Sequence, residues 1–273
     1  MLHTVGQLRD LEALARRRQS SLDFHLEFDS GMGRMGIEEA RAGEVADVLA
    51  AAPYLRLEGL ATHFASAENM ASGQTEEQLL RFNALVSKLS ARGVRPPFIH
   101  MANSAALAYR ADTWGTMVRP GLALYGYVMP SEGGQVQPVI HPAPILTWKA
   151  QIIAIKQYGA GVPLGYNASF TTPRPMRVGV LGVGYGDGLD RRLSNGGSVL
   201  AKGRLAPIVG LISMDVSLVD LSSSPEVVEG EYVTLLGAEG GLKQDALDLA
   251  AHCRTIPYEI LCGISRRAPR IYR

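Results

Sequence analysis

The sequence predicts an α/β unit over residues 1–130, followed by a mainly β unit over residues 131–273. In the first part, runs with helical and with strand periodicity alternate and are joined by short links, which is typical of parallel strands with helices packed outside them. In the second part, short β-prone runs are separated by Gly and Pro turns. A Gly- and Pro-rich stretch, SEGGQVQPVIHPAP, marks the crossing between the two patterns.

The elements of the first unit follow from the spacing of its apolar residues. Helical spacing predicts helices over 6–18, 38–52 and 75–91 and over the short segment NSAALAY at 103–109. Apolar runs that end at polar turns predict strands over Leu22–Phe28, Leu57–His63, Pro97–Met101 and Met117–Arg119.

In the second unit, five β-prone runs are expected to form strands: ILTWKAQIIAI, RVGVLGV, APIVGLI, VSLVDL and YVTLLG. Only one helical stretch, QDALDLAAHC, interrupts them. Cys253 and Cys262 are expected in the core, because two cysteines make neither a disulfide framework nor a zinc site.

Composition narrows the class of protein. The 27 basic and 26 acidic side chains leave a net charge of +1, which disfavours a nucleic-acid partner. There is no run of 18 apolar residues and the N-terminus has no apolar stretch of the signal-peptide kind, so we expect no membrane association and a cytoplasmic location. No metal site is expected either, since His63 and His100 fall on different strands with no cysteine nearby.

Polar residues gather where the strands of the first unit end. They are Asp29, Arg34, His63, Asn103, Ser104, Arg119 and Gly121. Active sites of βα barrels are built at those strand ends, and phosphate is a usual ligand of such a rim. One such residue would be unremarkable as hydrogen-bonded structure, but four consecutive strand ends that each carry one predict a ligand site.

Two segments of the second unit are also candidates. Tyr166 is expected in a turn between Gly165 and Asn167, and ISMD is expected to end a strand at Met214 and Asp215. Taken alone, a tyrosine that caps a strand and an ordinary strand end are the better explanations of these residues. The glycines of GVGYGDG do not form a dinucleotide-binding fingerprint.

At these residues the sequence resembles the bacterial alanine racemases. The resemblance runs from end to end and includes, in the family's order, FDSGMGRMG, THFASAEN, HMANSAA, VRPGLALYGY, LGYNASFTTPRP, GVGYGDGLDRR, GLISMD and PYEILCGISRRAPRIYR. It implies a fold-type III pyridoxal phosphate enzyme, with a (β/α)8 barrel and a C-terminal β domain in a head-to-tail homodimer. It also implies an isomerase that interconverts L- and D-alanine for peptidoglycan precursors of the bacterial cell wall.

The resemblance assigns the cofactor contacts one residue at a time. Arg119 resembles the arginine that faces the pyridine nitrogen, and since a guanidinium keeps its proton, that nitrogen stays unprotonated. Ser104, with Asn103 beside it and the N–H groups of Gly121 and Leu122, resembles the cradle of the phosphate.

The resemblance assigns the substrate contacts in the same way. Tyr166 resembles the catalytic base for one face of the substrate Cα, and His63 resembles the histidine that links the pyridine-facing arginine to this tyrosine of the other subunit. Arg34 resembles the arginine near the substrate carboxylate and the cofactor's phenolic oxygen. Met214 resembles the residue whose backbone N–H holds the carboxylate, with Asp215 supporting it.

Two positions depart from the family pattern. Glu27 stands where the family often has a carbamylated lysine. Because Leu26 and Phe28 alternate with it, we expect Glu27 to point into the barrel and orient Arg34, the alternative being a solvated glutamate at a strand end. Arg266 stands where the family has an inner-gate tyrosine.

The third departure is the cofactor lysine. The family places this Schiff-base lysine in a VVKANAYGHG-like motif, which is absent here, and none of Lys88, Lys149, Lys156, Lys202 and Lys243 follows a predicted strand of the first unit. Four predicted strands are half of a barrel's eight, so we expect the C-terminal half of a TIM-type (β/α)8 barrel followed by the C-terminal β domain.

Several interpretations stay open at this point. The sequence is that of a racemase that has been shortened, or a fragment that acts with another chain, or a non-catalytic truncated remnant that serves as a binding or assembly module. A broader amino-acid racemase is a further alternative, because serine and alanine differ by one hydroxyl that a pocket rejects weakly. Residues 1–273 by themselves are expected to lack racemase activity.

Overall fold

The computed structural model describes residues 1–272. The chain forms two compact units, of which the first is Met1–Ala143 and the second starts at Pro144. The sequence placed this boundary at residue 130. The segment between belongs to the first unit because backbone hydrogen bonds hold it there: Glu132 donates to Glu68 at 2.9 Å and Val139 to Ala108 at 2.8 Å.

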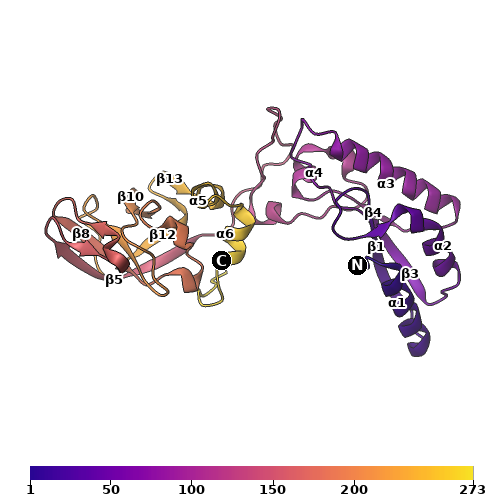
Figure 1. Ribbon diagram of the computed structural model, residues 1–273, viewed down its shortest axis with the longest axis horizontal. Coiled ribbons are helices and arrows are strands. Elements are labelled where there is room, and N and C mark those ends of the chain that lie inside the picture. Colours follow the sequence, from indigo (N-terminus) through magenta and orange to yellow (C-terminus); the bar gives the residue numbers. More distant parts are fainter. Residues whose placement is uncertain (273) are drawn as a thin grey trace. The chain divides into compact units, whose positions relative to one another are not determined.

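The first unit is built on a parallel sheet with the strand order β2-β1-β3-β4 (Figure 1). Its strands are β1 (Leu22–Asp29), β2 (Ile37–Glu38), β3 (Leu55–Ala61) and β4 (Phe98–His100). Its α-helices are α1 (Val5–Arg18), α2 (Ala42–Ala50), α3 (Gln74–Ala91) and α4 (Ser104–Tyr109). The predicted alternation of strands and helices is therefore confirmed.

The period of two in β1 decides which face of the sheet the helices cover. Phe24, Leu26 and Phe28 are buried in the core that the helices form with the sheet. His25 and Glu27 alternate with them and therefore lie on the opposite face, called the inner face below. The hydrophobic side chains thus fix the helix layer, and polar side chains are left for the inner face.

The prediction of a strand over Met117–Arg119 is wrong. Thr116 N–H donates to Ile99 O and Arg119 N–H donates to Ala102 O, both at 2.9 Å. The segment therefore runs beside β4 but does not pair with it continuously as a strand. Pro120 comes next and has no N–H to continue the pairing.

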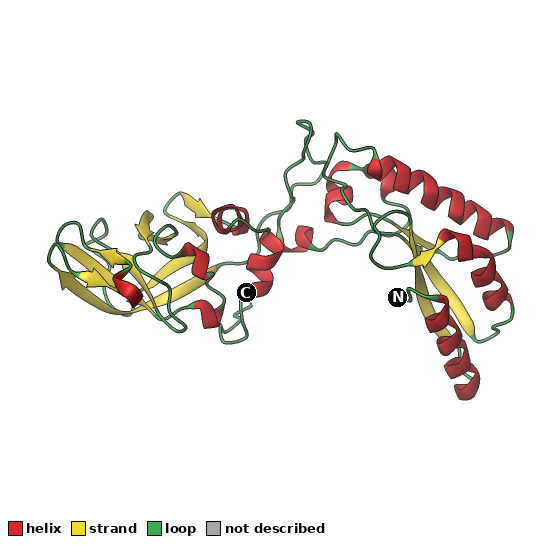
Figure 2. Cartoon of the chain, in the orientation of Figure 1, coloured by secondary structure: helices red, strands yellow, loops and turns green. Residues whose placement is uncertain are grey.

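The second unit is mainly β structure, as predicted (Figure 2). Its antiparallel sheet has the strand order β10-β9-β12-β5-β8-β11, with β13 paired to β12. Its strands are β5 (Trp148–Tyr158), β8 (Met176–Leu181), β9 (Ser198–Ala201), β10 (Arg204–Pro207), β11 (Ser217–Asp220), β12 (Tyr232–Glu239) and β13 (Leu242–Gln244). A separate hairpin is formed by β6 (Pro163–Leu164) and β7 (Phe170–Thr171).

Besides the unpredicted strands β6, β7, β9 and β13, three details of the second unit differ from the expectation. The helix α5 (Ala246–Cys253) is followed by an unpredicted helix α6 (Pro257–Gly263), which starts with a proline in its first turn. Cys253 is buried, but Cys262 on α6 is exposed and not in the core. The strand expected through residue 212 stops at Pro207. Ile208 and Val209 then contact Val219 and Leu218 of β11, and Gly210 turns the chain with φ of +77°.

In the part of the chain that the structure describes, no helix has the length and apolarity to cross a membrane.

Candidate active site

Arg119 is held at the end of the parallel sheet by four hydrogen bonds. Its Nη1 donates to His100 Nδ1 at 2.7 Å and to the His100 carbonyl at 2.8 Å. Its Nη2 donates to the carbonyls of Thr62 at 2.7 Å and Met101 at 3.3 Å. Its Nε has no partner among residues 1–272. The guanidinium is therefore fixed by its two terminal nitrogens and keeps one donor for a ligand.

His100 is bonded in turn to His25, a residue that sequence reasoning left out of the site. His25 Nδ1 lies 2.8 Å from His100 Nε2, and the His25 ring stacks on Phe98 with centroids 6.0 Å apart. Arginine can only donate, so His100 accepts at Nδ1, carries its hydrogen on Nε2 and donates to His25. The available signal was the alternation of β1, which places His25 on the same face as Glu27.

We expect Gly59→Ala to destabilise the first unit by about 1–3 kcal/mol, because the new methyl would overpack this pair. A Cβ at Gly59 would lie within 3.0 Å of three atoms of the His25 ring. Gly73→Ala is the matched control, since a Cβ there meets nothing within 4 Å and its φ is −74°. Urea unfolding followed by Trp114 fluorescence in a Trp148→Phe background measures the change; equal midpoints for both variants would contradict it.

We also expect the first unit to lose stability below pH 6.5, partly through His100. Burial, the charge of Arg119 and His25 lower the pKa of His100 from 6.5 to about 4. Below pH 6.5 the unfolded chain therefore binds a proton at His100 that the folded chain does not yet bind. The contribution of His100 to the free energy of unfolding is complete above pH 6.5 and is lost as the pH falls toward 4. In the same unfolding experiment, His100→Gln should lose less stability on acidification than the wild type. Plots of stability against pH that run parallel for the two proteins would refute the assignment.

Ser104 and the loop after Arg119 converge as expected, but with one difference. The Oγ of Ser104 accepts N–H groups from Gly121 at 2.8 Å and Ala123 at 3.1 Å. The Gly121 amide is thus already bonded to the serine, while the Leu122 N–H has no partner among residues 1–272. Asn103 is the N-cap of α4, with its Oδ1 accepting from Ala106 at 3.0 Å. The Ser104 hydroxyl hydrogen and the Leu122 amide are the donors left for an anion.

His63 lies half-buried near Arg119. Burial first, and then the charges of Arg119 and Arg34, lower the pKa of His63, so its imidazole is neutral at pH 7. Within residues 1–272 no hydrogen bond is formed by the His63 ring. Its predicted link to Tyr166 of the other subunit stays a prediction.

The predicted pair of Glu27 and Arg34 does not form among the described residues. Glu27 Oε2 instead lies 2.9 Å from His3 Nδ1, at ion-pair distance but without hydrogen-bond alignment. The reason is that the first residues run beside β1. Leu2 N–H donates to His25 O and Glu27 N–H donates to Leu2 O, which brings His3 next to Glu27. Arg34 is exposed beyond the turn that follows β1.

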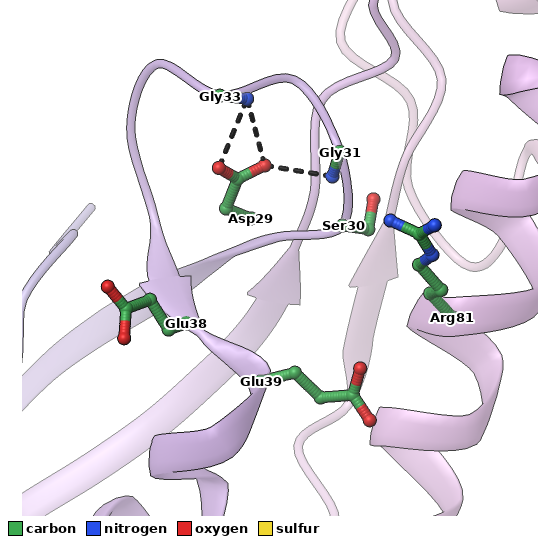
Figure 3. Close-up of a pocket in the computed structure, with 7 residues that line it drawn as sticks. All are labelled: Asp29, Ser30, Gly31, Gly33, Glu38, Glu39 and Arg81. Atoms are coloured by element: carbon green, nitrogen blue, oxygen red, sulfur yellow. Dashed lines mark hydrogen bonds between the residues drawn. The ribbon is translucent and has the colours of Figure 1, made fainter.

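Asp29 organises that turn (Figure 3). Its Oδ1 accepts N–H groups from Gly31, Met32 and Gly33 at 2.9–3.1 Å, so the carboxylate is used by the backbone. The hollow beside it has a volume of about 350 Å³ and is also lined by Glu38, Glu39 and Arg81. Asp29 therefore shapes the loop that carries Arg34 rather than serving as a free acid.

In the second unit, Tyr166 and the Met214 turn border one pocket of about 390 Å³, which is lined by Gly165, Tyr166, Leu211, Ser213, Val216 and Leu218. Tyr166 opens a short 3₁₀ turn, Tyr166–Ala168, and is 67% exposed. The segment 212–215 is a turn before β11 rather than the end of a strand, closed by a 3.0 Å bond from Ser213 N–H to Val216 O. The Met214 N–H has no partner among residues 1–272.

Asp215 has a partner that sequence reasoning missed. Arg267 Nη2 lies 2.5 Å from Asp215 Oδ1, and Arg267 Nε lies 3.2 Å from Asp187 Oδ1. The adjacent Gly186 donates its N–H to Met214 O at 2.9 Å. These contacts fix the Met214 turn against the loop 184–188. Arg266 is exposed.

Comparison with known proteins agrees with this arrangement of residues. The family model described as the N-terminal domain of alanine racemase matches residues 1–129, and that of the C-terminal domain matches residues 145–272. The alanine racemase of Symbiobacterium thermophilum is 42% identical over 248 residues, covering 91% of this chain and 65% of the relative. That of Halothermothrix orenii is 37% identical and covers 100% of this chain and 72% of the relative.

The chain belongs to the alanine racemase family. A crystal structure of the alanine racemase from Bartonella henselae with covalently bound pyridoxal phosphate is 27% identical, with a TM-score of 0.83, and matches 100% of this chain and 72% of that one. The chain thus spans about two thirds of the length of the relatives that it matches.

The first unit of this alanine racemase family member contains one lysine, and it forms no bond with Arg119 or Ser104. Lys88 is in the last turn of α3, and the others belong to the second unit. Lys202 pairs with Glu231 and Lys243 with Asp245, each at 2.6 Å. Within the described residues, the donors left around Arg119 and Ser104 come from arginine, serine and backbone groups.

Proposed function

We propose that this chain forms the pyridine-facing, phosphate-binding and tyrosine-bearing parts of a pyridoxal phosphate-dependent alanine racemase. The observation that carries the proposal is the Arg119 guanidinium, which is fixed by four bonds and keeps its Nε donor unpartnered. The Ser104 hydroxyl and the Leu122 amide, which the 2.8 Å bond from Gly121 N–H to Ser104 Oγ brings together, fit a phosphate. The residues present therefore fit this cofactor.

In this proposal, residues of both units take part in the reaction. Pyridoxal phosphate, when bound, withdraws electrons from the substrate Cα. Arg119 donates through Nε and does not give up its proton, so it leaves the pyridine nitrogen unprotonated. The Tyr166 phenolate removes or returns the Cα proton on one face. A free phenol titrates near pH ~10, so a phenol that acts as a base at neutral pH needs a positive charge nearby. Across a homodimer the Arg119 guanidinium would supply that charge, with the neutral His63 imidazole between the two.

The Met214 N–H and Arg34 hold the substrate carboxylate in this proposal, and alanine is the substrate. The partner is a second copy of the chain, and the place of action is the cytoplasm, where D-alanine enters cell-wall precursors. A non-catalytic binding module is the second candidate, because the unit that holds Arg119 and Ser104 has Lys88, in the last turn of α3, as its one lysine.

The test uses purified residues 1–273 with pyridoxal phosphate and each alanine enantiomer in deuterated water. We expect reversible cofactor binding by absorbance, no lysine adduct after borohydride, and no interconversion. We also expect Tyr166-dependent deuterium uptake at Cα from one enantiomer, because one of the two bases is present. Failure to bind the cofactor would overturn the proposal, whereas binding without deuterium uptake would support the binding module.

A further inference from the structure

The loop that carries Tyr166 and the loop that leads to Met214 lie against each other through two glycines. Gly165 has φ of +70° and Gly210 has φ of +77°. A Cβ at Gly165 would lie 3.6 Å from Leu211 N, and one at Gly210 would lie 3.5 Å from Leu164 O. Both loops line the 390 Å³ pocket beside Tyr166. Their separation therefore sets the distance between the phenol and the Met214 amide.

A single side chain from a third segment bonds to both loops. Asn195 Oδ1 accepts the N–H of Gly210 at 2.6 Å, and Asn195 Nδ2 donates to the carbonyl of Ser169 at 3.3 Å. The neighbouring Ser194 Oγ accepts the N–H of Ile212 at 3.0 Å. Asn195 thus joins the end of the Tyr166 turn to the start of the Met214 loop.

The backbone at Asn195 explains why this residue type suits the position. Its φ is +57°, in the left-handed region that asparagine tolerates better than most side chains. It follows the short turn Arg191–Leu193, and Gly197 N–H returns to Leu193 O at 2.8 Å. An asparagine amide also offers a donor and an acceptor at once, which the two contacts require.

We propose that Asn195 is a positioning residue that sets the Tyr166 phenol relative to the Met214 amide. The inference rests on the proposed function, since it concerns the same proton transfer and the same carboxylate contact. Asn195 touches neither substrate nor cofactor in this proposal. It acts by holding the two loops that do, and a displacement of about 1 Å at such a site can cost about 100-fold in rate.

Two variants separate the two bonds. Asn195→Asp keeps the acceptor for Gly210 and loses the donor to Ser169. Asn195→Gly loses both and keeps the backbone free to adopt positive φ. Arg254→Gly is the matched control, because Arg254 also has positive φ, at 53°, and caps α5 in the same unit.

The full chain is assayed for Cα deuterium uptake with pyridoxal phosphate and alanine, and for amide hydrogen exchange by mass spectrometry. Asn195→Asp should lower the uptake rate at saturating alanine about tenfold with an unchanged KM. Asn195→Gly should lower it by about 10- to 100-fold and also raise KM, because the Met214 loop is released. Amide exchange should accelerate over 164–172 in both variants, and over 208–216 only in Asn195→Gly.

Wild-type rate and KM in both variants would overturn the inference, and so would equal losses in Arg254→Gly. If the wild-type chain itself shows no deuterium uptake, the proposed function fails. Amide exchange then decides this inference alone: unchanged exchange over both segments in Asn195→Gly would overturn it, and the selective pattern would support it.

Discussion

Tyr166→Phe is expected to reduce Cα deuterium uptake by about 10²- to 10⁴-fold, the usual contribution of a positioned acid–base group. The hydroxyl is the only group that this change removes, and the ring that lines the pocket remains. Tyr166 is 67% exposed, so the loss of its hydroxyl should leave the unfolding transition of the second unit unchanged. Cofactor binding should also be unchanged, because Arg119 and Ser104 belong to the other unit.

The measurement is mass-spectrometric uptake at Cα from each alanine enantiomer, beside cofactor binding by absorbance. Tyr232→Phe is the matched control, since Tyr232 is 59% exposed on β12 of the same unit and does not line the pocket. Retention of uptake within about twofold in Tyr166→Phe would remove Tyr166 from the mechanism.

Arg119→Gln should cost both stability and cofactor affinity. The side chain donates four hydrogen bonds at the ends of β3 and β4, to Thr62, His100 and Met101. Removing the guanidinium leaves these part-buried acceptors without their donor, at a cost of about 1–3 kcal/mol, so the first unit should unfold at lower urea. Arg119→Lys keeps the charge but not the planar fork, and it should recover only part of the loss.

Trp114 fluorescence in the Trp148→Phe background reports this unfolding, and absorbance titration reports pyridoxal phosphate binding. Arg81→Gln is the control, because its ion pair with Glu77 is exposed and 3.4 Å long and should contribute less than about 1 kcal/mol. If Arg119→Gln behaved like Arg81→Gln in both measurements, Arg119 would be neither an anchor of the strand ends nor a cofactor contact.

Local patterns in the sequence determined much of the fold. The spacing of Leu8, Phe82 and their neighbours predicted the helices, and the alternation of Phe24, Leu26 and Phe28 predicted the buried face of β1, since burial repeats with the geometry of each element. The ordered motifs also indicated the alanine racemase family, which the comparisons confirm. The segments that failed, 117–119 and 208–212, are those in which a proline or a positive-φ glycine ends the pairing.

Only the tertiary structure decided which polar groups meet. The sequence offered His63 and Arg34 as partners of Arg119 and Glu27, but the hydrogen-bonded histidine is His100 and the carboxylate's neighbour is His3. His25 and His100 are 75 residues apart, and Asn195 lies 15 residues from Gly210 and 26 from Ser169. Hydrogen bonds depend on separations near 3 Å and on direction, which strand register and loop packing set and residue periodicity does not encode.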